Sequence, residues 1–234
     1  PSSPISGGAL LGDRLRMKTS SEDDGVFVRS LACRGQFGGL SAEVWPMSLV
    51  MMAAFDITLI ETVGVGQSET TVHEMTDFFL LLQLAGAGDG LQGIKRGIIE
   101  MADAIAINKA DGDNAKHAQL AKVEFNRALH LYPEKESLWA PKVTLCSALN
   151  NEGIDNIWNI IEEYKQLTSK NNYLNQKRSE QNKFWLIQTI EEQLKTSFFN
   201  DSKIKEELQK QLHLIEINKT TPFAAADYLL KLKK

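Results

Sequence analysis

Short runs of apolar residues, separated by more polar stretches, recur along the first two thirds of the chain. Four of them have strand length and do not alternate cleanly with polar residues: Ile57–Ile60, Phe78–Leu82, Ala104–Ile107 and Val143–Cys146. A further candidate strand lies within Gly25–Leu31. Continuous apolar strands are typical of a parallel sheet that is covered on both faces. The pattern therefore predicts an α/β fold over residues 1–165, in which a mostly parallel sheet carries helices on both faces.

The stretches between these runs carry helix signals. Ser41 is a suitable N-cap for a helix that ends near Ala54. Further helices are predicted at Ile94–Met101 and Asn114–Leu131, between consecutive apolar runs. Helices that alternate with apolar strands favour strand–helix–strand units with parallel strands.

After Gly153 the apolar residues recur only at helical spacing, and Lys and Glu dominate the polar positions. Lys170–Asn172 is a predicted break, and Thr221-Pro222 is a predicted helix start, with the cap followed by proline at the first helical position. Residues 166–234 are therefore predicted to form an all-helical extension. Its apolar stripes exceed what one flank of an α/β domain can cover, so we expect this extension to hold a homodimer together.

Composition excludes several classes of protein. The chain is 43% hydrophobic and 24% charged, which permits a full core. Its net charge of -4 offers no electrostatic attraction to nucleic acid or to an anionic membrane. No apolar run approaches the ~18–20 residues of a membrane span. The two cysteines, Cys33 and Cys146, form no CxxC pair and suit a reducing compartment, so we expect a cytoplasmic protein.

The sequence Asn108-Lys-Ala-Asp111 directly follows an apolar run and has the NKxD pattern of guanine-binding proteins. The carboxylate of Asp111 can accept hydrogen bonds from guanine N1–H and from its exocyclic amine, and adenine lacks both donors in that arrangement. Lys109 can lay its methylenes along the base, and Asn108 can brace neighbouring loops. Ligands bind at the carboxyl ends of strands in open α/β sheets, and this position favours a guanine site over an ordinary polar loop.

Ser147-Ala-Leu149 follows the next apolar run. In GTP-binding proteins a Ser-Ala pair at this place offers a backbone N–H to guanine O6. A plain strand-to-helix turn has the same local pattern, and the spacing from Asn108–Asp111 is what favours a role for Ser147, Ala148 and Leu149 in binding the nucleotide.

Two glycine-rich segments follow other apolar runs. Glu61 ends the first run, where a carboxylate can hold the hydration shell of Mg²⁺, and the Gly64 amide can approach a γ-phosphate. Gly64-Val-Gly66 permits a mobile switch loop, to which Gln67 is attached. The second segment is Gly86–Gly90. Taken alone, each segment is explained as well by an ordinary surface connector.

Several segments together resemble the MeaB/ArgK family, the methylmalonyl-CoA mutase-associated GTPases formerly described as LAO/AO transport system kinases. The segments are Pro1–Asp13, Val26–Leu31, Glu61–Glu69, Gly86–Asp89 and Asn108–Asp111. The nine-residue string Glu61–Glu69 is the most specific of them. The resemblance extends through the helical extension to Thr221-Pro-Phe-Ala-Ala-Ala.

This resemblance implies a fold, a chemistry and a partner. Members of the family have a P-loop NTPase fold, bind GTP or GDP with Mg²⁺, and form homodimers through the helical extension. They couple GTP hydrolysis to the loading and protection of adenosylcobalamin on methylmalonyl-CoA mutase. By resemblance, Asp13 and Glu61 lie near Mg²⁺, Gly64 and Gln67 belong to the catalytic switch, and residues 86–95 form a switch loop that responds to the mutase.

The sequence departs from the family pattern in two places. It contains no Gly-x-x-x-x-Gly-Lys-[Ser/Thr] phosphate-binding loop, which in the family lies upstream on a central strand. We therefore expect residues 1–234 to be a truncated chain that binds GTP poorly and is inactive by itself. Position 90 is Gly where the family usually has Glu, which removes a carboxylate from the switch loop.

The predicted function is that of a GTP-hydrolysing chaperone of methylmalonyl-CoA mutase or a related cobalamin-dependent acyl-CoA mutase. An alternative is a non-hydrolysing interaction module that keeps the helical extension and the partner-facing loops. A kinase linked to amino-acid transport is a third possibility, but the sequence supplies no phospho-acceptor site for it.

Overall fold

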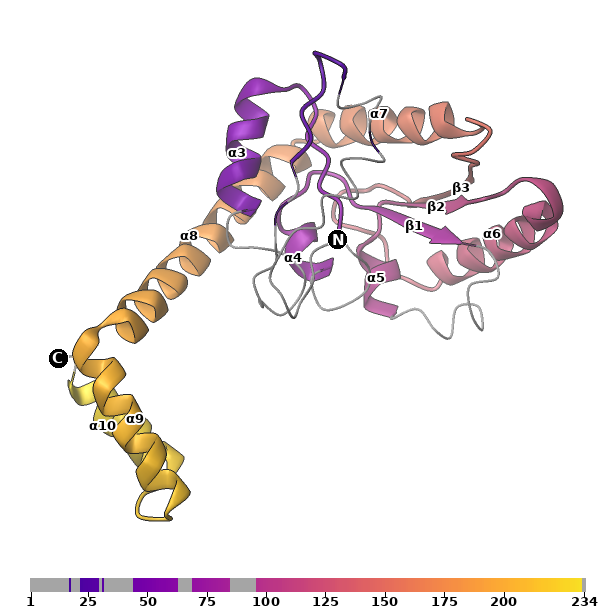
Figure 1. Cartoon of the computed structure of the whole chain (residues 1–234). Helices are drawn as coiled ribbons and strands as arrows, with labels where there is room; N and C mark the ends of the chain where they lie inside the picture. Colours follow the sequence, from indigo (N-terminus) through magenta and orange to yellow (C-terminus); the bar gives the residue numbers. More distant parts are fainter. Residues whose placement is uncertain are drawn as a thin grey trace. The chain divides into compact units, whose positions relative to one another are not determined.

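The structure is a computed structural model that describes residues 17, 22–29, 31, 44–62, 69–84 and 96–232 (Figure 1). Its compact units divide between Arg178 and Ser179, and each unit is described by itself. The elements of the first unit are α3 (Val44–Ala54), α4 (Glu69–His73), β1 (Leu80–Leu84), α5 (Arg96–Met101), β2 (Ala104–Asn108), the single turn η2 (Gly112–Asn114), α6 (Ala115–Leu129), β3 (Lys142–Leu145) and α7 (Ile154–Lys170). Helix α8 (Tyr173–Asn200) crosses the division, and α9 (Ser202–Glu216) and α10 (Pro222–Leu232) follow it.

The described sheet has three parallel strands in the order β1-β2-β3. Leu80 pairs with Ala104 and Ala104 pairs with Lys142, so the three strands begin at one edge of the sheet. Their carboxyl ends therefore meet at the opposite edge, where Asn108 ends β2. This confirms the predicted parallel arrangement for three of the apolar runs.

Helices cover both faces of this sheet, as predicted (Figure 1). Ile105 and Ile107 of β2 are fully buried in a core that also contains Ile99 of α5 and Phe125 of α6. On the other face, Ala104 packs with Trp139 and with two residues of α7, Ile160 and Tyr164. Each buried Ile contributes about 1.5–3 kcal/mol relative to exposure, so β2 is the most strongly held strand of the described sheet.

Two predicted strands are not formed in the described part of the chain. Residues 57–60 and 26–29 are not assigned to any strand. A strand requires a neighbour for its backbone N–H and C=O groups, and the described sheet ends at β1. Ile57 and Leu59 are accordingly 53% and 87% exposed. An apolar run of strand length was therefore insufficient to predict a strand at these two positions.

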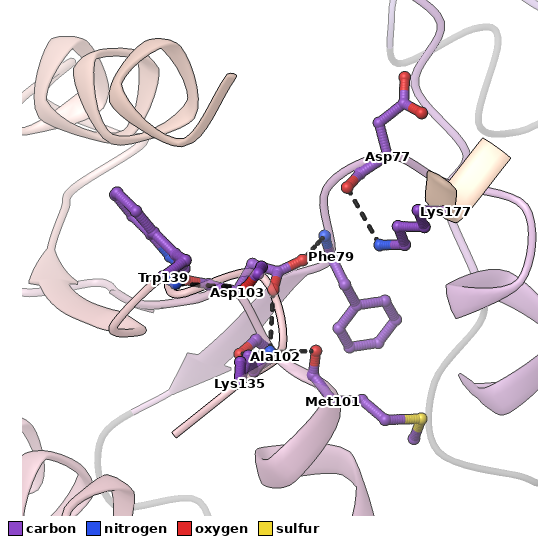
Figure 2. A network of polar contacts seen from close by, with 9 residues as sticks. Asp77, Phe79, Met101, Ala102, Asp103, Lys135, Trp139 and Lys177 are labelled. Carbon is purple, nitrogen blue, oxygen red and sulfur yellow. Dashed lines mark hydrogen bonds and ion pairs between the residues drawn. The ribbon is translucent and has the colours of Figure 1, made fainter. Parts of the chain in front are cut away.

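A buried ion pair fixes the edge of the sheet at which the strands begin (Figure 2). Asp103 is 3% exposed and its carboxylate accepts from the Phe79 N–H at 3.0 Å and from Lys135 Nζ at 2.8 Å. Lys135 also donates to the carbonyl oxygens of Met101 and Ala102, at 3.0 and 2.8 Å. Trp139 Nε1 donates to the Asp103 carbonyl at 2.8 Å. One carboxylate thus ties the starts of β1 and β2 to the segment that leads into β3.

The first turns of α8 belong to the same unit as the sheet. Lys177, which is 7% exposed, donates to the Asp77 carbonyl at 3.0 Å (Figure 2). Arg178 binds the Asp77 carboxylate through two hydrogen bonds of 2.9 and 2.6 Å. Burial lowers the pKa of Lys177, and the hydrogen bonds to Asp77 raise the pKa of Arg178. These contacts, and the packing of α7 on the sheet, explain why the first unit extends beyond residue 165.

The second unit contains the rest of α8 and the hairpin of α9 and α10, which confirms the predicted helices. Asp201 caps α9 by accepting from the N–H groups of Lys203 and Ile204. Thr221 caps α10, since its hydroxyl accepts from Ala224 N at 3.2 Å. The hairpin buries three apolar side chains, which belong to Ile204, Ala225 and Leu229.

Candidate functional site

The two sequence motifs that were predicted to read guanine meet at the carboxyl edge of the sheet. Asn108 is the last residue of β2, and Asp111 stands immediately before η2. Ser147 follows β3, and its backbone N–H and C=O pair with Glu152 at 2.9 and 3.0 Å to close a short loop. The loop presents Ala148 and Leu149, which are exposed.

Asn108 links these two loops through its side-chain oxygen. Asn108 Oδ1 accepts from Lys109 N at 2.8 Å and from Ala148 N at 3.0 Å, and the Cys146 thiol lies 3.8 Å away. The Ala148 N–H, which the sequence suggested for guanine O6, is therefore engaged by Asn108 in this structure. A base oxygen at that position must share the Ala148 N–H with Asn108 Oδ1 or displace Asn108 Oδ1 from it.

Asp111 is held by the neighbouring loop as well. Its Oδ2 accepts from the Ser147 hydroxyl, and Ser147 Oγ in turn accepts from Asn150 N at 3.1 Å. Ser147 is only 1% exposed, whereas Asp111 is partly exposed. The buried Ser147 hydroxyl thus holds one carboxylate oxygen of Asp111, while Asp111 itself remains partly exposed.

Backbone geometry at the site depends on residues that the sequence patterns did not identify. Lys109 has a left-handed backbone, with φ of 58°, and Asn114 Nδ2 donates to its carbonyl oxygen at 2.7 Å. Gly153 has φ of 72°, and a Cβ at this position would lie 2.4 Å from the Leu145 carbonyl oxygen. Glycine therefore allows the loop to return against the end of β3. An asparagine at the start of a helix and a glycine before one are the only sequence signals of these roles.

Cys146 lies beside the site but is a packing residue. It is 5% exposed, and burial raises the pKa of its thiol. A raised pKa favours the protonated thiol, which suits a packing role.

Of the residues predicted for phosphate and metal chemistry, only Glu61 belongs to the described part of the chain. Glu61 is exposed and follows residues 57–60, which are not assigned to a strand. Asp13, Gly64, Gln67 and residues 86–90 lie outside the described residues. Within the described ranges, His, Cys, Asp and Glu form no group of three or more suited to a metal ion. A single exposed carboxylate is an oxygen ligand of the kind that Mg²⁺ accepts, together with water.

None of the helices in the described ranges is both long enough and apolar enough to cross a bilayer.

Comparisons with known proteins agree with the geometry of this edge. Residues 1–203 match the family model "Methylmalonyl Co-A mutase-associated GTPase MeaB". GTPase ArgK of Escherichia coli is 40% identical over 223 residues, which are 95% of this chain and 67% of that protein. The mitochondrial methylmalonic aciduria type A homolog of Mus musculus is 40% identical over 232 residues, which are 99% of this chain and 56% of that protein.

A solved structure of a LAO/AO transport system kinase shares the fold, with a TM-score of 0.61 and 37% identity. The match covers 80% of this chain and 60% of the solved one. The chain thus spans about two thirds of the length of its bacterial relative and less of the mouse protein and the solved structure. The family model and both relatives lead to one conclusion: the chain belongs to the MeaB family of methylmalonyl-CoA mutase-associated GTPases.

Proposed function

We propose that the complete protein binds and hydrolyses GTP and acts as a chaperone of a cobalamin-dependent methylmalonyl-CoA mutase, or of a closely related acyl-CoA mutase. The observation that supports this most is the joining of Asn108, Asp111 and Ser147 at one edge of the sheet. The family name and the name of the mouse relative support the mutase as partner.

Base recognition follows from the chemistry of these side chains. Asp111 accepts from guanine N1–H and from the exocyclic amine, while Ser147 keeps the carboxylate oriented. Adenine offers neither donor in that geometry, so binding it would leave the carboxylate desolvated without a partner. Lys109 is exposed and lays its methylenes along the base, and Leu149 lies in the same loop as the Ala148 N–H.

Hydrolysis requires positioning and charge neutralisation more than covalent chemistry by the protein. Glu61 and Asp13 would hold Mg²⁺, which supplies neutralisation of the charge on the phosphates. The Gly64 amide would approach the γ-phosphate, and Gln67 would belong to the same switch. A Gly-rich phosphate-binding loop, of the kind that P-loop GTPases use, would supply the remaining contacts to the phosphates.

The mutase should alter nucleotide binding and hydrolysis by the complete protein. If GTP changes the affinity for the mutase, the mutase must change the affinity for GTP by the same factor. The measurement is GTP hydrolysis with and without the mutase encoded in the same genome, together with gel filtration in GDP and in a non-hydrolysable GTP analogue. Because Gly90 replaces a carboxylate, we expect weaker stimulation than in members with Glu. Absence of any complex and of any change in rate would favour the non-hydrolysing interaction module.

The helical extension should dimerise the protein. Helix α8 carries a stripe of exposed apolar residues, in which Ile187 is 53%, Ile190 45% and Leu194 64% exposed. A stripe of this kind on a helix favours a protein partner, and a second copy supplies the same stripe. Light scattering should show that Ile187→Ser/Leu194→Ser is monomeric. The matched variant Glu191→Ser/Lys195→Ser changes exposed polar positions on the same helix and should remain dimeric; a dimeric Ile187→Ser/Leu194→Ser protein would contradict the assignment.

A further inference from the structure

We propose that Asn114 is a positioning residue for guanine recognition, which fixes the backbone of Lys109 and thereby the placement of Asn108 and Asp111. This inference rests on the guanine site proposed above. Asn114 is the last residue of η2 and stands directly before α6.

Lys109 adopts a conformation that needs support. Its φ of 58° lies in the left-handed region, which a residue with a Cβ rarely adopts. Both peptide groups around it are bonded: Lys109 N donates to Asn108 Oδ1 at 2.8 Å, and its carbonyl accepts from Asn114 Nδ2 at 2.7 Å. The first bond is local to the motif. The peptide group between Lys109 and Ala110 is held on both sides, because Ala110 N also donates to the Cys146 carbonyl at 3.0 Å. The bond from Asn114 is the side-chain contact that ties this peptide group to η2.

Asn114 closes the same turn a second time with its backbone. Asn114 N donates to the Asp111 carbonyl at 3.1 Å. The residue therefore holds the two positions of the motif that would touch the base, one through each of its donors. Since Asn108 Oδ1 also accepts from Ala148 N at 3.0 Å, a shift of Lys109 would pass to the loop after β3.

The usual role of asparagine at this position does not explain the contact. An asparagine before a helix ordinarily caps it, with its side-chain oxygen accepting from the N–H groups of the first turn. Asn114 makes no such cap on α6, and its side chain points its amide donor to Lys109 instead. Aspartate has the same shape and caps helices equally well, but it has no hydrogen to donate to a carbonyl.

This difference separates positioning from stability. Asn114→Asp removes no cap, since Asn114 makes none on α6, and Asp is itself a favourable residue before a helix, so the melting temperature of the variant should not fall by more than a few degrees. The Kd for GDP should nevertheless rise about 5- to 10-fold, which is the usual worth of one hydrogen bond. The GTPase kcat at saturating GTP should stay unchanged, because Asn114 contacts no phosphate-binding residue among those described. Asn126→Ala is the matched control, since Asn126 Nδ2 also donates to a backbone carbonyl, that of Lys122, but within α6 and away from the motif.

The role of the left-handed backbone is tested by adding Lys109→Gly to the wild type and to Asn114→Asp. Glycine adopts positive φ without strain, so Asn114→Asp should raise the Kd for GDP by less than about 2-fold in that background. An equal rise in both backgrounds, an unchanged Kd in Asn114→Asp, or a fall in kcat with unchanged Kd would each overturn the proposal. In nucleotide-free Asn114→Asp, the three-bond HN–Hα coupling and the ¹³C shifts of Lys109 should no longer have the values of a left-handed backbone. If the wild type does not bind GDP, the proposed function fails, and these NMR signals still decide whether Asn114 positions Lys109.

Discussion

Replacing Asp111 with Asn should transfer the base preference of the complete protein from guanine to xanthine. The carboxamide can accept only through its oxygen, so one of the two bonds from guanine is lost, and the Kd for GTP should rise about 10- to 100-fold. Xanthine carries a 2-oxo group where guanine has its amine, and the new amide can donate to that oxygen. The Ser147 hydroxyl, which donates to Asp111 in the structure, can serve either end of the amide because it rotates freely.

Competition between GTP and xanthosine triphosphate for a fluorescent guanine nucleotide gives the result directly. Asp113→Asn is the matched control, since Asp113 is an exposed carboxylate two residues further along the chain. The control should keep the preference of the wild type. If Asp111→Asn also keeps it, Asp111 does not read the base.

Removing one partner of the buried Asp103–Lys135 pair should have the largest effect on stability. Lys135→Met leaves the Asp103 carboxylate, 3% exposed, with the Phe79 N–H but without the cation that hydrogen-bonds to it. Breaking a buried pair in this way costs about 3–5 kcal/mol, because one charge stays desolvated without compensation. Urea unfolding followed by far-UV circular dichroism measures this loss.

The exposed pair of Lys142 and Glu163 provides the comparison. Their side chains are 42% and 55% exposed, so Lys142→Met should cost no more than about 1 kcal/mol. Adding Asp103→Asn to Lys135→Met should recover part of the loss, because the uncompensated charge is then gone. Equal costs for Lys135→Met and Lys142→Met would show that the Asp103 network does not hold the amino edge of the sheet together.

Local sequence patterns predicted the strands and helices that pair or pack with other described elements. Three apolar runs became β1, β2 and β3, and the helical periods after Gly153 became α7 to α10. The prediction of a strand at Ile57–Ile60 was wrong, because strand formation depends on a pairing partner and not on the apolar run itself. The break at Lys170–Asn172 was right: α7 ends at Lys170 and α8 begins at Tyr173.

Sequence motifs predicted only part of the site. The position of Asn108 and Asp111 after β2 followed from the strand before them. The bond between Asn108 and Ala148, 40 residues apart, depends on how two loops close at one edge. The left-handed Lys109 and its anchor Asn114 depend on backbone angles that no residue pattern of this kind specifies. Asp103 and Lys135 lie in two different connections between helices and strands, so their pairing likewise follows from the topology.

Recognition of guanine at the carboxyl edge of the sheet is tested most directly by calorimetric titration of the complete wild-type protein with GDP and with ADP. Both nucleotides carry the same sugar and phosphates, so any difference in Kd comes from the base. A site that hydrogen-bonds the guanine donors through Asp111 should bind GDP about 1,000-fold more tightly than ADP, or more. Similar Kd values for the two nucleotides would contradict the assignment of Asn108, Asp111 and Ser147 to a guanine site.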